Sequence, residues 1–433
     1  MEATVSTVQS DALIGPLSLG LDQNGASYVT QKREATVHSA IPSCSFNGVN
    51  TLRLNLASAT EWADVSSAYM TFKIVNESTT APLEFIVQPH VIFNRMQVRV
   101  SGALLEDITN YNRLCEQMYA LQGTQKRLNA AQYGLPTDMT NVNLFESLDH
   151  KPTPIPQSGS ARVCMTMPLS SVFGASQHKY LPLYAFSSGG CELQFTMDDP
   201  TNYLVATKAG VAQSTSFRIE EIQLHCNMIT LDSALQEKYF ASLARGDAML
   251  IHTKCWSHHE MFVQPSQGSF EVSLDKPLSR LATVFVSYAR EKTAADKAGG
   301  ESYVNSFDFF SDNEESYETQ LQVGATRIPE YPTRGIAEAW LRFQSALGVQ
   351  NSLAHPLGVS FEDYRDKHHS IAFDTEKVPL ASNTGLNTNG LQLRLDVKHL
   401  ENTAGTEQIR RVYMALHSDC IFEIRAGGVS KLD

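Results

Sequence analysis

Alternation of apolar and polar residues with a period of two runs through this chain and restricts it to β structure. Leu52, Leu54 and Leu56 alternate with polar residues, and the segments 70–75 and 270–274 show the same pattern. Such alternation places one face of a strand on a core and leaves the other face toward solvent. Because the short runs are separated by Gly, Pro and Asn, they predict an all-β fold built as a sandwich or barrel.

The second half of the chain repeats the plan of the first. The segment 179–183, Lys-Tyr-Leu-Pro-Leu, leads through two glycines to Leu-Gln-Phe at 193–195. The segment 377–380, Lys-Val-Pro-Leu, leads through two glycines to Leu-Gln-Leu at 391–393. The lysines are 198 positions apart, and so are the Leu-Gln pairs. This repetition predicts two β-sandwiches in tandem.

Helical spacing interrupts the strands at equivalent places in the two halves. Leu114, Met118 and Leu121 lie at i, i+4 and i+7, which predicts a helix over about 110–122 with one apolar face. A second helix is predicted over about 335–347, and it begins 225 residues after the first. A helix at the same place in each half supports a true duplication.

A third helix is predicted over about 233–246, and we place the domain boundary at its start. This division gives an N-terminal tail (1–24), a first sandwich (25–232) and a second sandwich (233–433) that includes the helix as a linker. The segment from Arg290 to Ser302 is rich in charged residues, Ala and Gly. We expect it to form an exposed loop.

Length and charge exclude several classes of protein. With 433 residues the chain is long enough for two to three domains, each with its own core. The net charge of -12 argues against a surface that neutralises phosphates over a long stretch, so no sequence-specific nucleic-acid binding is expected. No apolar run approaches the roughly 20 residues of a membrane span, and 1–24 lacks the features of a signal peptide. We expect a soluble product made inside a cell.

The seven cysteines are widely spaced, and no CxxC element occurs. Their odd number and spacing are typical of reduced thiols in a cytosolic or nuclear compartment. The densest group of possible metal ligands is Cys-Trp-Ser-His-His at 255–259. A structural zinc site needs about four such ligands from two paired elements, and no second pair follows nearby. We therefore interpret 255–259 as a strand end with exposed imidazoles, and His368 and His369 as polar loop residues.

Acidic residues gather at Asp308, Asp312, Glu314 and Glu315, where they could attract calcium. The EF-hand spacing is absent, which favours a solvated loop. The patterns of phosphate-binding loops, zinc proteases and serine hydrolases are also absent. The sequence Asn-Glu-Ser at 76–78 fits a glycosylation acceptor that we expect to stay unused in this compartment. We predict no enzyme activity and assign no catalytic, cofactor-binding or metal-binding residue.

Seven short segments share the loose patterns of one family, and the resemblance that they carry covers nearly all of 25–430. They are 93–96, 105–112, 168–174, 179–183, 373–380, 384–388 and 420–424. These segments resemble double jelly-roll major capsid proteins of small double-stranded DNA viruses, in the PRD1–adenovirus lineage. The short chain with compact loops looks most like those of polinton-like viruses and virophages. Residues 168–183 are similar to the late part of the first barrel, and 373–388 to the same part of the second.

The resemblance implies both an architecture and a role. Each chain would form two tandem eight-stranded antiparallel jelly-roll sandwiches with a few short helices. Three chains would form a homotrimer with a pseudo-hexagonal outline, and these capsomers would tile an icosahedral shell around a double-stranded DNA genome. The implied partners are neighbouring trimers, a single jelly-roll vertex (penton) protein, other minor capsid proteins and, in part of the family, an internal membrane. The implied location is the virion, after synthesis in the host cytoplasm or nucleus.

Two other functions fit the β content. A tandem β-sandwich carbohydrate-binding protein or glycosidase would need exposed aromatic residues over a groove, and a glycosidase also two carboxylates roughly 5–10 Å apart. Trp62, Trp256 and Trp340 do not cluster in the sequence. A trimeric phage-type spike would share the strands but would lack the internal duplication.

Overall fold

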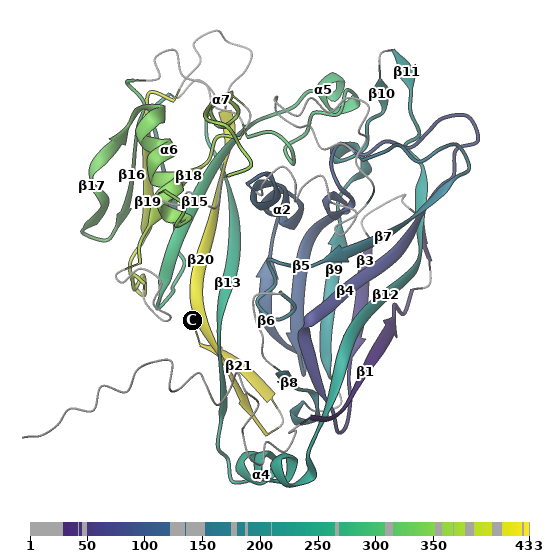
Figure 1. Cartoon of the computed structure of the whole chain (residues 1–433). Helices are drawn as coiled ribbons and strands as arrows, with labels where there is room; N and C mark the ends of the chain where they lie inside the picture. Colours follow the sequence, from purple (N-terminus) through teal and green to yellow (C-terminus); the bar gives the residue numbers. More distant parts are fainter. Residues whose placement is uncertain are drawn as a thin grey trace, which may run out of the picture.

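The computed structural model describes most of the chain between Val29 and Leu432. The described residues are 29–41, 43–45, 50–121, 135, 152–174, 180–186, 189–208, 210–264, 268–307, 315–350, 357–366, 368–376, 385–400, 409–426 and 428–432. The proposed tail over 1–24 lies outside them. Figure 1 shows two upright β-sandwiches side by side, the first built from the N-terminal half of the chain and the second from the C-terminal half.

The first half of the chain forms two facing antiparallel sheets. In spatial order, one consists of β1 (Val29–His38), β12 (Phe217–Leu231), β4 (Trp62–Asn76) and β7 (Ser160–Thr166). The other consists of β3 (Thr51–Leu56), β9 (Cys191–Met197), β5 (Phe93–Val100) and β6 (Ala103–Ile108). The short strands β2 (Ser43–Ser45) and β8 (Tyr180–Pro182) extend the first sheet, and β10 (Thr207–Lys208) and β11 (Val211–Ala212) form a hairpin.

The second half repeats this arrangement. One sheet runs β13 (Met249–Phe262), β20 (Ile409–Arg425), β15 (Leu281–Arg290) and β18 (Ile371–Asp374), with β21 (Gly428–Leu432) paired to β20. The other runs β14 (Phe270–Leu274), β19 (Leu393–Lys398), β16 (Glu318–Val323) and β17 (Thr326–Arg334). In both halves the main strands, numbered along the chain, lie in the orders 1-8-3-6 and 2-7-4-5. This order is that of an eight-stranded jelly roll, and it confirms the predicted fold class and the duplication.

Short helices connect the strands. The helix α2 (Tyr111–Ala120) follows the fifth main strand of the first jelly roll, and α6 (Gly335–Ala346) follows the fifth of the second, as predicted. The helix α4 (Ser233–Ala244) connects the last strand of the first sandwich to the first strand of the second, and its bounds are close to those predicted for the linker helix. The remaining helices are α5 (Ala294–Ala298), α7 (Phe361–Asp366), η1 (Pro89–Ile92), η4 (Leu183–Ala185) and η5 (Pro200–Asn202). None of the helices in the described residues is long and apolar enough to cross a bilayer.

The repeat does not superimpose residue by residue at the offset of 198. Leu193 is the third residue of β9 and is fully buried, whereas Leu391 precedes β19 and is 43% exposed. The buried position that corresponds to Leu193 is filled by Leu395, the third residue of β19. The duplication therefore lies in strand order and alternation, while loop lengths differ between the halves. The motif at 377–380 lies outside the described residues.

The two jelly rolls do not have fully separate interiors. One buried cluster fills the second sandwich alone and includes Val284, Leu321 and Met414. The other fills the first sandwich and continues into the second through Phe285, Phe343 and a group at the lower ends of β13 and β20. This continuity follows from β15, which is buried on both faces along nearly its whole length. One face of β15 lines the second core, and the other lies toward the first jelly roll.

Candidate functional site

The two jelly rolls meet along a continuous contact that we call the seam. The first contributes β6, α2 and the turn at 109–110 between them, and the second contributes β13, β20, β21 and the segment 303–307. Asn110 adopts a left-handed backbone with φ of 47°, which Asn tolerates better than most residues. The turn ends β6 and begins α2 immediately, so the polar face of α2 lies against the second jelly roll.

Arg113 of α2 is the largest fully buried side chain in the described part of the chain. Its guanidinium donates to acceptors of the second jelly roll, namely the carbonyl oxygens of Tyr288, Tyr303 and Ser306 and the hydroxyl of Ser287. The guanidinium carbon also lies 4.4 Å from the ring centroid of Phe307 and 4.1 Å from that of Tyr413. Because an unpaired buried charge is very unfavourable, this dense set of acceptors and aromatic faces allows the burial. Arg113 therefore fixes the two sandwiches in one relative position.

Tyr303 makes a second polar link across the seam. Its hydroxyl accepts hydrogen bonds from the side-chain amides of Asn94 (3.0 Å) and Asn112 (3.1 Å) and donates to the carboxylate of Asp198. The three partners lie on the first jelly roll, whereas Tyr303 follows α5 in the second. The hydroxyl thus has its donor and acceptor capacity satisfied by groups from the other sandwich.

The segment before Tyr303 was expected to be an exposed loop, and this expectation is wrong in part. Lys292, Gly300 and Ser302 are buried, and the carbonyl of Ala298 accepts a hydrogen bond of 3.0 Å from the backbone N–H of Ala206. The reason is tertiary contact. Charged and small residues predict a loop from sequence, but here the segment 290–302 crosses to the first jelly roll and packs on it.

The histidine cluster at 255–259 belongs to the seam and not to an exposed strand end. His258 is only 2% exposed, and its Nδ1 lies 3.0 Å from the carbonyl oxygen of Thr109, while the Thr109 hydroxyl donates to the His258 carbonyl. Burial lowers the pKa of His258 to about 3 and that of His259 to about 4, which favours neutral imidazoles. The described residues contain no group of three or more His, Cys, Asp or Glu side chains placed to hold a metal ion.

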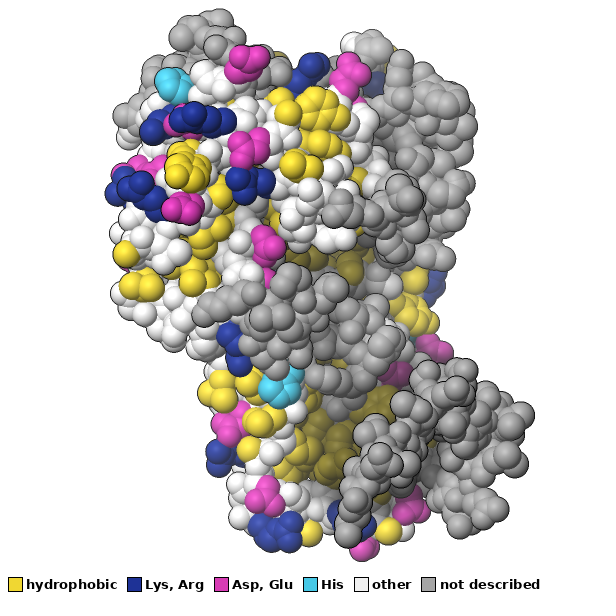
Figure 2. All heavy atoms as spheres, turned by 60° about the vertical axis from the view of Figure 1, so that its left-hand side comes forward, with side chains coloured by type: hydrophobic (Ala, Val, Ile, Leu, Met, Phe, Trp, Pro, Cys, Tyr) yellow, Lys and Arg dark blue, Asp and Glu magenta, His cyan; other side chains and the backbone are white. Residues whose placement is uncertain are grey.

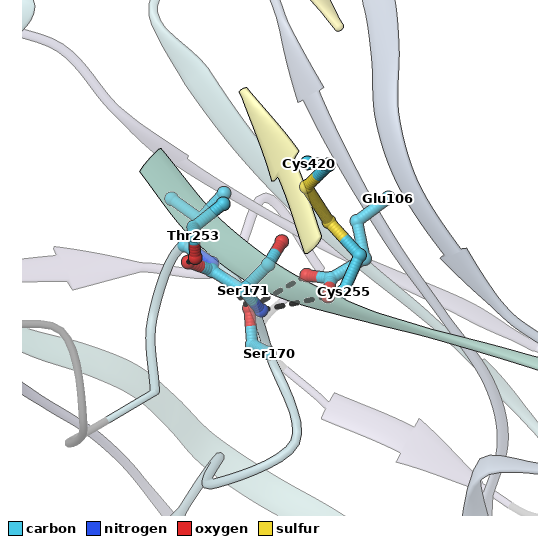
Figure 3. Close-up of a disulfide and its surroundings, with 7 residues drawn as sticks. Glu106, Ser170, Ser171, Thr253, Cys255 and Cys420 are labelled. Atoms are coloured by element: carbon cyan, nitrogen blue, oxygen red, sulfur yellow. Dashed lines mark hydrogen bonds between the residues drawn. A yellow bond between two sulfur atoms is a disulfide. The ribbon is translucent and has the colours of Figure 1, made fainter. Parts of the chain in front are cut away.

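The expectation of reduced thiols throughout is also wrong. Cys255 of β13 and Cys420 of β20 form a disulfide across adjacent antiparallel strands, and both residues are buried (Figure 3). The other five cysteines, which are Cys44, Cys115, Cys164, Cys191 and Cys226, are free thiols. Sequence spacing could not indicate this pair because the two residues are 165 positions apart and only the strand pairing brings them together.

A buried carboxylate lies beside the disulfide (Figure 3). Glu106 of β6 accepts hydrogen bonds from the hydroxyl of Ser170 (2.8 Å) and the backbone N–H of Ser171 (2.7 Å). The carbonyl of Ser171 accepts a 3.0 Å hydrogen bond from Thr253 of the second jelly roll. Burial raises the pKa of Glu106, and the two serines oppose that effect only in part. These contacts extend the seam down to the lower half of β13.

His369 differs from the expected polar loop residue. It is fully buried among the rings of Tyr288, Tyr317 and Tyr364, and burial lowers its pKa to about 3. His368 is half-buried and lies beside the ring of Phe307. Periodicity could not reveal this burial because His369 precedes the short strand β18 and lies outside any alternating run.

Carboxylates do gather on the outer face of the sheet β14-β19-β16-β17, around a depression of about 680 Å³. There Glu271 pairs with Arg394 at 2.7 Å, and Glu318 pairs with Arg334 at 3.0 Å and Lys398 at 3.4 Å. These acids therefore form ion pairs with basic side chains on a polar surface.

The three tryptophans lie elsewhere and apart from one another. Trp62 packs against Tyr184 and Tyr239, Trp256 against Phe285 and His417, and Trp340 against Phe343 and Tyr364. Within the described residues, these tryptophans therefore do not line a common groove for sugars.

Two further sequence motifs have different outcomes. Asp308, Asp312 and Glu314 lie outside the described residues, whereas Glu315 is exposed. Asn76, the proposed glycosylation acceptor, is 2% exposed, and its amide nitrogen donates to the carbonyls of Ala81 and Pro156 at 2.9 and 3.1 Å. An amide held in this way is part of the core and is not accessible to modification.

Solved structures match this chain over nearly its whole length, although no protein-family model and no curated protein matches it. PBCV-1 VP54, fitted into a reconstruction of the virophage Sputnik, has a TM-score of 0.61 at 9% identity, with 95% of this chain and 99% of that chain covered. The Faustovirus major capsid protein has a TM-score of 0.56 at 7% identity, with 94% of this chain and 92% of that chain covered. The mavirus major capsid protein has a TM-score of 0.50 at 9% identity, with 95% of this chain and 92% of that chain covered.

These neighbours are double jelly-roll major capsid proteins, and the present chain has the same fold over nearly its whole length. At such low identity the likeness concerns the fold and not individual residues. The residues that form the seam therefore have to be understood from their own contacts.

Proposed function

We propose that this double jelly-roll chain is the major capsid protein of a small double-stranded DNA virus and acts by self-assembly. Three copies form a homotrimer with a pseudo-hexagonal outline, and the trimers tile an icosahedral shell around the genome. The observation that carries the proposal is the match of the whole chain to capsid proteins whose own chains are covered almost completely. The function then lies in interfaces and not in a reactive site.

The seam supports this proposal on physical grounds. A shell subunit must transmit contacts on one side to contacts on the other without bending between its two sandwiches. Arg113, Tyr303 and Thr253 join the sandwiches through buried hydrogen bonds. A rigid block with repeated halves is suited to closed, symmetric assembly.

Further parts of the proposal concern the setting of the protein. The chain divides into a tail (1–24) and two jelly rolls (25–232 and 233–433), and it is not an enzyme. Its partners are neighbouring trimers, a single jelly-roll vertex protein, other minor capsid proteins and an internal membrane where the virus has one. It is located in the virion after synthesis in the host cytoplasm or nucleus. Its relatives are the capsid proteins of polinton-like viruses and virophages.

The test is the mass of the purified native protein, with negative-stain images of the same sample. We expect a particle of three chains with a hexagonal outline, or closed shells. A protein that stays monomeric across salt and pH would contradict the proposal. A glycan-binding screen would then examine the carbohydrate alternative.

A further inference from the structure

A pocket of about 390 Å³ lies where the segment 292–298 of the second jelly roll crosses over the first. Both sandwiches line it. The first contributes Leu204 and Ala206, among others, and the second contributes Lys292, Ala294 and Lys297. Figure 1 shows this crossing at α5, at the upper end of the molecule. The volume is within the range of about 300–1,000 Å³ that is typical of small-molecule sites.

Backbone contacts hold the two walls of the pocket at a fixed distance. The backbone N–H of Ala206 donates a 3.0 Å hydrogen bond to the carbonyl oxygen of Ala298. Gly300 has a φ of 93°, and a Cβ at this position would lie only 3.0 Å from a methyl carbon of Val205. A glycine therefore allows the crossing segment to approach the first jelly roll closely. The pocket is formed before any ligand arrives.

Apolar side chains form most of the pocket surface. Pro200 and Leu204 come from the first jelly roll, and Ala294 and Ala298 from the second. Leu204 is buried, being 2% exposed. An apolar group placed against these side chains would be removed from water, which favours its binding.

The charge of the pocket lining is positive, because its described residues include Lys292 and Lys297 and no acidic residue. The side chain of Lys292 is only 3% exposed. Its ammonium nitrogen lies 3.3 Å from the carboxylate of Glu301, and the same oxygen accepts a 3.0 Å hydrogen bond from Arg290. Since Glu301 is 56% exposed, this carboxylate lies at the rim of the buried charge. An anion inside the pocket would therefore interact strongly with the buried ammonium.

The nearby carboxylates are bonded within their own segments. Asp199 accepts hydrogen bonds from the backbone N–H (2.9 Å) and the hydroxyl (2.8 Å) of Thr201. Asp296 accepts the same pair of hydrogen bonds from Thr293, at 2.9 and 2.8 Å. Both carboxylates are thus turned to the chain beside them, and neither lines the pocket.

The depression on the outer face of the sheet β14-β19-β16-β17 is different. Figure 2 shows the side of the molecule that carries β17, with basic and acidic side chains intermixed at the surface. The depression is lined by charged residues of both signs, namely Glu271, Glu318, Asp396, Arg327, Arg394 and Lys398. Its charges are paired with one another, so it favours neither an anion nor a cation. The pocket at α5 combines an apolar lining with one sign of charge.

We propose that the pocket at α5 binds a small amphiphilic anion, a carboxylate on an alkyl chain of medium length. The alkyl chain lies against Leu204 and the alanines, and the carboxylate lies at Lys292 and Lys297. Because the ligand contacts both sandwiches, its binding stabilises the folded chain by mass action. This site goes beyond the capsid role and does not depend on it.

Octanoate is the probe, and saturation-transfer difference NMR on the full-length protein at neutral pH measures its binding. We expect a dissociation constant of about 0.1–1 mM, the strength typical of so small a ligand. Octylammonium has the same alkyl chain with the opposite charge and should bind about tenfold more weakly or worse. Equal affinity for the two probes, or no saturation transfer to octanoate at millimolar concentrations, would overturn the proposal.

Two variants locate the binding. Lys297→Glu should weaken octanoate binding about tenfold or more and strengthen octylammonium binding, because it reverses one charge of the lining. Ala294→Trp should abolish the binding of both probes by filling the pocket. Ala294 is exposed and Lys297 is half-buried, so both variants should fold, which circular dichroism and thermal unfolding would check.

The matched control is Lys238→Glu, an exposed position on α4 at the opposite end of the molecule, which should leave the affinity unchanged. Octanoate should also raise the melting temperature of the wild type and of Lys238→Glu, but not that of Ala294→Trp. Unchanged octanoate affinity in either Lys297→Glu or Ala294→Trp would place the ligand elsewhere and overturn this site.

Discussion

The guanidinium carbon of Arg113 lies 4.1 Å from the ring centroid of Tyr413, and the two residues belong to different jelly rolls. A helix of the first sandwich thus places a permanent charge on an aromatic face of the second. Both side chains are almost completely removed from water. Moving one sandwich relative to the other would therefore break a buried contact and lower the stability of the whole chain.

Replacing Arg113 by Ala should lower the free energy of unfolding by about 3–5 kcal/mol, because buried acceptors on the second jelly roll lose their donor and a cavity remains. Urea unfolding followed by intrinsic fluorescence measures this change. The control is Arg53→Ala, whose side chain is 64% exposed and which should change stability by less than about 0.5 kcal/mol. Equal midpoints for the two variants would show that Arg113 does not hold the seam.

Acid should destabilise the protein through its buried histidines. Burial lowers the pKa values of His258, His369 and His417 to about 3 from an ordinary 6.5. Between these values the unfolded chain binds more protons than the folded chain. Stability is therefore complete above pH 6.5 and falls as the pH decreases toward 3. Each histidine contributes a slope of about 1.4 kcal/mol per pH unit in this window.

Urea midpoints measured between about pH 7 and pH 4 test this dependence. His369→Phe keeps an aromatic ring among the three tyrosines but cannot be protonated, so its midpoint should fall less steeply with acid than that of the wild type. A variant with the same slope as the wild type would show that His369 is not a source of the acid sensitivity.

The disulfide between Cys255 and Cys420 should be detectable by counting thiols. The unfolded protein should react with an alkylating reagent at five cysteines before reduction and at all seven after it. Because the bond closes a long loop, Cys255→Ser combined with Cys420→Ser should lower stability by about 2–4 kcal/mol. Labelling of seven thiols in unreduced protein would contradict the pairing.

Asn76 should be structural and unmodified. Asn76→Ala removes the donor to the Ala81 and Pro156 carbonyls and should destabilise the protein by about 1–3 kcal/mol in thermal or urea unfolding. Asn55→Ala, at an exposed position of β3, is the control and should have little effect. A natively folded protein that carries a glycan on Asn76 after expression in a secretory pathway would contradict its burial.

The strands and their duplication could be predicted from sequence because alternation is a local property. Leu52, Leu54 and Leu56 show the inward face of β3 directly, and Leu114 and Met118 show the inner face of α2. Such patterns depend only on which side of an element meets its own core.

The seam could not be predicted in the same way. Arg113 lies on the face of α2 away from the apolar stripe, where a sequence pattern indicates solvent, and a second sandwich covers that face instead. His258 and His369 were interpreted as exposed for the same reason, since polar residues buried by distant segments leave no local periodicity. The information was present only as complementarity between residues more than a hundred positions apart.

The strand β20 has a consequence for how such a chain can change over evolutionary time. One face of this single strand fills the second core with Val412, Met414 and Leu416. Further along, the same face supplies Phe422 and Ile424 to the cluster shared with the first jelly roll. Insertion or deletion of one residue between these groups would turn one group outward, because side chains alternate along a strand. Length variation among descendants of this protein should therefore be confined to the loops, while β20 keeps a constant length.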